Sequence, residues 1–242
     1  MFRLVGLVLT SLLGVMSLLV LVVVILLAPF GAVLTNPVVG FGGGNLPYVS
    51  RSGVSGTEIA AGAQLLADHV YGPWANEYDT VNDPFMRSVA QFWIDSCGSN
   101  GVICSVAQSG NLQCVEFVTG ALFLSGVRLP YVDDAIKFWP AYASQSGWKR
   151  VSVAQSYPQP GDMVIWQGGE FGHIAIVINV SLPSRQHDGL VTVAQGNGMG
   201  NRWDASHQSS PGNWYSMPLH ANGTLDTWNG YRVLGYIRQD SK

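Results

Sequence analysis

The order of its hydrophobic patterns constrains this 242-residue chain more than any other feature. Apolar residues first recur at helical spacing, in three segments at residues 56–72, 84–96 and 113–125. After about residue 150, short runs rich in β-branched residues replace them, at residues 162–166, 173–180, 190–195 and 231–238. Helices followed by strands are typical of an α+β domain. The sequence therefore predicts N-terminal helices packed on an antiparallel β-sheet.

The N-terminus carries an uncharged apolar run over residues 4–28, preceded by Arg3. At about 1.5 Å per residue, a helix of this length crosses a ~30 Å hydrocarbon core. The apolar region of a signal peptide is usually only ~7–15 residues long. We therefore expect residues 1–28 to be one transmembrane helix that leaves the C-terminal domain outside the cell membrane. The alternative is a long signal peptide cut near Ala32, which would release a secreted protein.

The remaining chain divides into a linker and a domain. Residues 29–56 are rich in Gly, Pro and Ser and lack helical periodicity, which is typical of a flexible linker. Residues 57–242 then form the folded domain, in a compartment where disulfides form. The net charge is −3 and the Lys and Arg residues are scattered, so the composition argues against a nucleic-acid partner.

The three cysteines predict a structural pair and a single thiol. Cys97 and Cys104 bracket the turn-forming residues of "CGSNGVIC", so they are the natural disulfide, and Cys114 is left over. A Cys104–Cys114 bond, or three buried thiols, are alternatives that the spacing does not exclude. The spacing is not CxxC and no histidine lies nearby in sequence, so we predict no metal site.

Cys114 lies where a thiol can become reactive. Asn111 is a candidate N-cap, which would place Cys114 in the first turn of the helix at 113–125. A helix N-terminus and a nearby imidazolium both lower the pKa of a thiol, and the thiolate is the attacking species. A buried structural cysteine is the alternative, and for an arbitrary cysteine it is the commoner case.

His173 is the candidate base. It opens the apolar strand at 173–180, where a polar side chain lies at the end of the sheet. Antiparallel pairing would bring the next strand alongside, with Gln195 and Asn197 near its end. Either amide oxygen could accept a hydrogen bond from the ring and so orient it. A surface histidine, with two ordinary turn residues, is the alternative.

Five segments together resemble the CHAP family, the cysteine, histidine-dependent amidohydrolases/peptidases of the papain-like superfamily. They are "LQCVEF", "PQPGDMVIW", "GHIAIV", "VAQGN" and "VLGYIR", within roughly residues 57–240. The resemblance implies a papain-like fold, Cys114 as nucleophile, His173 as base and peptidoglycan as substrate. The chain departs from the family at Gln195, where Glu is frequent. It also departs at Val115 and Glu116, where aromatic residues are common.

The mechanism that we expect is acyl transfer through a thioester. His173 holds Cys114 as a thiolate that attacks a peptide or amide carbonyl, and the backbone N–H of Cys114 and the side chain of Gln113 stabilise the oxyanion. His173 then protonates the leaving amine, and water releases the acyl group. The activity would be that of an endopeptidase or an N-acetylmuramoyl-L-alanine amidase, without a cofactor. A non-catalytic wall-binding or scaffold protein and a membrane-anchored acyltransferase of the same superfamily are the alternatives.

Overall fold

The computed structural model describes most of the chain after residue 52. The described residues are 53–72, 74–99, 104–127, 129, 132–143, 145–153, 155–198, 214–227 and 230–240, all within the compact unit Tyr48–Lys242. The predicted membrane anchor at 1–28 and most of the linker lie outside them. Within the described ranges, no helix is long and apolar enough to cross a membrane. The boundaries of anchor, linker and domain stay predictions.

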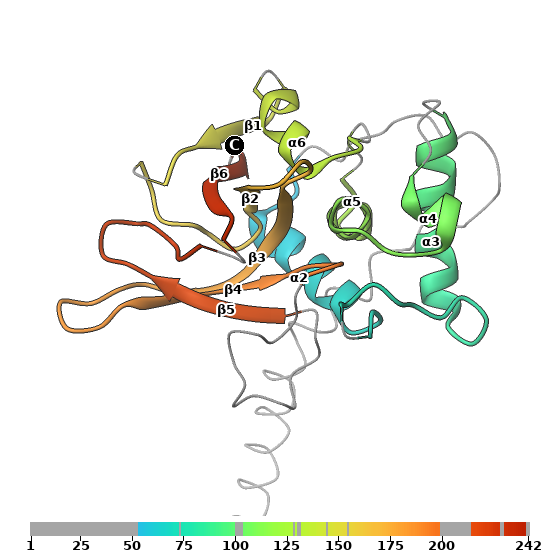
Figure 1. Cartoon of the computed structure of the whole chain (residues 1–242), viewed down its shortest axis with the longest axis horizontal. Coiled ribbons are helices and arrows are strands. Elements are labelled where there is room, and N and C mark those ends of the chain that lie inside the picture. Colours follow the sequence, from blue (N-terminus) through green and yellow to red (C-terminus); the bar gives the residue numbers. More distant parts are fainter. Residues whose placement is uncertain are drawn as a thin grey trace, which may run out of the picture. The chain divides into compact units, whose positions relative to one another are not determined.

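The helical part precedes the strands, as the pattern predicts. The described helices are α2 (Gly56–Ala67), α3 (Pro84–Ser99), α4 (Ser105–Ser109), α5 (Cys114–Leu124) and α6 (Ala135–Ala141). A capping box starts α2: the Ser55 hydroxyl accepts the Glu58 N–H, and the Glu58 carboxylate accepts the Ser55 N–H. In α5 every residue from 115 to 122 is buried, because this helix lies between the sheet and the pair α3 and α4 (Figure 1).

The strands form one antiparallel sheet. They are β1 (Trp148–Val151), β2 (Met163–Gln167), β3 (His173–Ser181), β4 (Gly189–Ala194), β5 (Trp214–Leu219) and β6 (Arg232–Gln239). Their order is β1-β6-β2-β3-β4-β5, and every neighbouring pair is antiparallel. Both α2 and α5 pack against β3. The observed class is therefore α+β, with N-terminal helices packed on a six-strand antiparallel sheet.

Alternation along β3 divides the apolar residues between two clusters. Ile174 and Ile176 belong to the cluster that the helices share, whereas Ala175 and Val177 belong to a second cluster. Successive side chains of a strand point to opposite faces, so a strand that is buried on both faces has no polar alternation. This burial explains the continuous apolar run in the sequence. The same burial holds β3 against α5, so that His173, the first residue of β3, lies near this helix.

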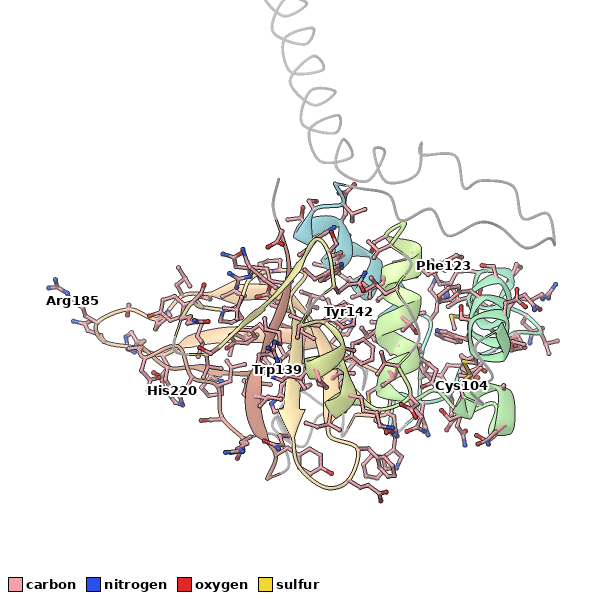
Figure 2. All side chains as sticks on the ribbon, turned by 90° about the horizontal axis from the view of Figure 1, so that it is seen from above. Cys104, Phe123, Trp139, Tyr142, Arg185 and His220 are labelled. Atoms are coloured by element: carbon pink, nitrogen blue, oxygen red, sulfur yellow. A yellow bond between two sulfur atoms is a disulfide. The ribbon has the colours of Figure 1, made fainter. Side chains whose placement is uncertain are left out.

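The predicted disulfide is confirmed. Cys97 and Cys104 are bonded, with their Cα atoms 5.6 Å apart, and Cys114 is the free cysteine. The bond joins the last part of α3 to the residue that precedes α4, near the position of Cys104 in Figure 2. The alternative bond between Cys104 and Cys114, and the alternative of three thiols, are thereby wrong.

Candidate active site

Cys114 is the first residue of α5, but the predicted N-cap was wrong. Gln113, not Asn111, is the cap: its backbone is extended (φ −105°, ψ 172°), and its carbonyl accepts the Phe117 N–H at 3.0 Å. The side chain of Gln113 makes no capping hydrogen bond, because it is engaged elsewhere in the site. Cys114 is half-buried, at the end of the helix where N–H groups have no partner within the helix.

His173 is held by Gln195. The ring Nε2 lies 2.6 Å from the Gln195 side-chain oxygen, and the two side chains are 3% and 0% exposed. Because an amide oxygen can only accept, Nε2 carries the proton and donates it, which leaves Nδ1 as the basic nitrogen. The ring of Trp166 lies 5.7 Å from the imidazole, centroid to centroid, and limits its movement on one side.

Packing of α5 against β3 brings the cysteine and the histidine together. The backbone N–H of Ile174, the residue after His173, lies near the sulfur of Cys114 and lowers the pKa of its thiol. The head of a helix and the start of a strand therefore meet at the sulfur atom. Gln195 follows the last residue of β4, which pairs with β3, so the sheet supplies both the histidine and its partner.

Asn197 contacts the residue before the nucleophile, not the histidine. Its side-chain Nδ2 donates to the side-chain oxygen of Gln113. Its backbone lies in the left-handed region, with φ at +48°, which asparagine tolerates better than most residues. Of the two candidates for orienting the imidazole, Gln195 is the one within hydrogen-bonding distance of His173.

A short segment before α3 supports both sides of the site, and sequence reasoning missed it. The carbonyl of Ala75 accepts the N–H of Asn197, and the carbonyl of Asn76 accepts the N–H of Leu112, both at 3.1 Å. Ala75 is fully buried and has a φ of +52°, an uncommon conformation for alanine. Nothing in the sequence around Ala75 signals this role, because the contacts are made by backbone carbonyls.

Burial favours the neutral forms of both side chains. It raises the pKa of the Cys114 thiol to about 12, and the nearby Glu116 carboxylate adds to the rise. The N–H groups of Ile174 and Val115 act against it. Burial lowers the pKa of the His173 imidazole to about 4, and the hydrogen bond to Gln195 acts against that. Burial therefore acts against the thiolate that we expected from the helix head and the imidazolium. Desolvation outweighs the helix terminus here.

Two other histidines have side-chain contacts away from this site. His69 lies 2.5 Å from Asp83, and His220 lies between Asp188 and Asp226. Among the described residues, no three His, Cys, Asp or Glu side chains come together in a group that could hold a metal ion.

Comparison with known families agrees with this geometry. The model of the CHAP domain matches residues 105–197. This part of the chain is therefore similar to CHAP domains. It contains Cys114, His173, Gln195 and Asn197 and ends at the last of them. The predicted family is confirmed, and a CHAP domain suggests a hydrolase that depends on cysteine and histidine and implies a peptidoglycan substrate. Neither a curated protein nor a solved structure matches the chain.

Proposed function

We propose that this CHAP protein is a cysteine hydrolase that cleaves a peptide or amide bond of peptidoglycan, as an endopeptidase or an N-acetylmuramoyl-L-alanine amidase. One arrangement carries the proposal. The half-buried thiol of Cys114 lies near the N–H of Ile174, and the residue before Ile174 is a histidine whose Nε2 proton is held by Gln195. This is the nucleophile, base and orienting group that acyl transfer requires.

The first step starts from the neutral pair. His173 Nδ1 takes the thiol proton as the sulfur of Cys114 attacks the carbonyl carbon, because burial disfavours a preformed thiolate and imidazolium. Gln195 keeps the ring in the tautomer that leaves Nδ1 unprotonated. The imidazolium then gives the proton to the leaving amine, and a thioester acyl-enzyme remains. Water hydrolyses the thioester with His173 again as the base.

The oxyanion is stabilised by the residues at the head of α5. The backbone N–H of Cys114 has no partner within the helix and is the first donor. Gln113 is the second donor. Because its side-chain oxygen accepts a hydrogen bond from Asn197, its amide N–H groups point the other way and are available to the substrate oxygen. In this mechanism Asn197 orients Gln113, and Gln195 orients His173.

A non-catalytic wall-binding protein is the second candidate. Gln195 favours it, since an amide stabilises an imidazolium less than the Glu that is frequent in the family. Burial favours it as well, because it disfavours the thiolate of Cys114 and the imidazolium of His173. In either case we propose that residues 1–28 anchor the protein in the membrane, so that the domain would meet peptidoglycan on the outer side.

Purified peptidoglycan distinguishes these functions. The protein and its Cys114→Ala variant are incubated with wall material, and the soluble products are identified by mass and by their new amino termini. An amidase frees the amino group of the first residue of the stem peptide, which is the peptide attached to the glycan. An endopeptidase frees the amino group of a residue further along that peptide. Acyl addition to an acceptor would indicate the acyltransferase. Co-sedimentation with the wall, without products, would indicate the binding protein.

A further inference from the structure

Glu116 is a buried carboxylate that the proposed mechanism does not use. It lies in the first turn of α5, two residues after Cys114, and is 1% exposed. Ser105 donates to its Oε1 twice, from the hydroxyl at 2.8 Å and from the backbone N–H at 3.2 Å. The indole N–H of Trp93 donates to the backbone carbonyl of Glu116 at 2.7 Å. The side chain of Glu116 therefore accepts hydrogen bonds from α4, and its backbone carbonyl accepts one from α3.

Both donors lie on the two helices, α3 and α4, that the Cys97–Cys104 disulfide links. Ser105 follows Cys104 directly and begins α4, and Trp93 lies on α3, one turn before Cys97. We define α3, α4 and their bond as the disulfide unit. It packs on the side of α5 that faces away from the sheet in both views (Figures 1 and 2). The disulfide unit therefore contacts the head of α5 through Glu116.

The charge of Glu116 acts against the thiolate. It raises the pKa of the Cys114 thiol, and it also raises that of the Tyr78 phenol, which burial raises more. A residue that only filled space at this place would not need to be ionisable. A buried carboxylate is costly unless donors meet it, so its position is determined by the donors of Ser105. The same hydrogen bonds from Ser105 hold the first turn of α5 in one orientation about the helix axis.

We propose that Glu116 is a positioning residue that ties the head of α5 to the disulfide unit, so that the Cys97–Cys104 bond holds Cys114 toward His173. The proposal rests on the proposed function in one respect, that Cys114 is the nucleophile. It predicts that the disulfide acts on Cys114 by way of Ser105 and Glu116. Opening the disulfide and removing the Ser105 hydroxyl should then have overlapping effects.

The test is a double-mutant cycle on the full chain, read by alkylation of Cys114 with iodoacetamide. Cys97→Ser with Cys104→Ser, and Ser105→Ala, should each slow alkylation at neutral pH about tenfold, and together hardly more than either alone. Ser109→Ala is the matched control, because its hydroxyl lies on the same helix but bonds the Ser105 carbonyl and the Asn111 N–H, not Glu116. Independent effects that multiply, or a Ser105→Ala rate equal to that of the control, would overturn the proposal.

A pH profile separates positioning from a merely structural role. Glu116→Gln keeps an oxygen that Ser105 can bond but removes the charge that raises the thiol pKa, so alkylation should reach half its maximum at a lower pH than in wild type. The Cys114 thiol lies near the Glu116 carboxylate of its own helix and near Ile174, which follows His173 on β3. Tyr78 is a further titratable group near that carboxylate. An unmoved midpoint would contradict the proposal. Alkylation needs no wall substrate, so this result stands whether or not peptidoglycan is hydrolysed.

Discussion

Replacing Gln195 by alanine should disable His173 without removing it. The substitution deletes the acceptor that lies 2.6 Å from Nε2, in a place where both side chains are buried. A buried donor that loses its acceptor costs ~1–3 kcal/mol, and each 1.36 kcal/mol is tenfold in rate. If the whole of this free energy is lost from transition-state stabilisation, because the imidazole is no longer oriented, kcat/KM for a soluble wall fragment should fall roughly 5- to 150-fold.

Gln195→Glu is the informative partner variant. A carboxylate accepts from an imidazolium more strongly than an amide does, by roughly 1 kcal/mol, so the pKa of His173 should rise by about 0.7. The base must be neutral in the free enzyme, so activity is lost as pH falls through this pKa. The acid limb, which lies near pH 4 in wild type because burial lowers the pKa of His173, should therefore move upward. At pH 7 activity should be retained or raised.

The assay is kcat/KM across pH 3.5 to 8 for wild type and both variants, with thermal unfolding to confirm that each is folded. A Gln195→Ala enzyme at the wild-type rate, together with an inactive Asn197→Ala enzyme, would give the orienting role to Asn197. An acid limb that stays in place or moves downward in Gln195→Glu would refute the electrostatic reasoning.

Three further outcomes are expected. Cys114→Ala should abolish hydrolysis in a zymogram and leave the far-ultraviolet circular dichroism unchanged, because the small side chain at a half-buried position leaves little cavity. Asp226 and then Asp188 raise the pKa of His220, so its contribution to stability is present below about pH 6.5 and is lost as pH rises through the raised value. The melting temperature should accordingly drop more between pH 6 and pH 9 in wild type than in His220→Gln. The intact protein should sediment with membranes; recovery from the medium with an N-terminus after residue 28 would contradict the anchor.

Local patterns predicted the elements that build the site. The helix at 113–125 and the strand at 173–180 are observed as α5 and β3 with small changes at their ends. Elements with weak patterns were missed: β1 is four residues long, α4 is five, α6 contains Pro140, and β5 contains Pro218. Short elements have too few residues to show a period, and they form because neighbours complete their hydrogen bonds and cover their apolar side chains.

The N-cap of α5 shows where local preference fails. Asn111 is the better cap by propensity, yet the helix begins after Gln113, whose side chain is bonded by Asn197 from a distant loop. Cap preference applies to a residue whose side chain can accept a hydrogen bond from a backbone N–H of its own helix. A side chain that the tertiary structure uses for another contact no longer follows that preference.

By itself, the sequence determined the α-then-β order and favoured the pairing of Cys97 with Cys104, without excluding other pairings. Periodicity and turn chemistry are local properties, and they are sufficient for these predictions. Cys114 and His173 became the candidate reactive residues through their positions and through the resemblance to the CHAP family. Only the tertiary structure decided that Gln195 contacts the histidine, and that burial favours the neutral forms of Cys114 and His173. The hydrogen-bond partner and the pKa of a side chain depend on the groups that enclose it. Those groups come from α5, β3 and the loop after β4, which are brought together only when the helix packs on the sheet.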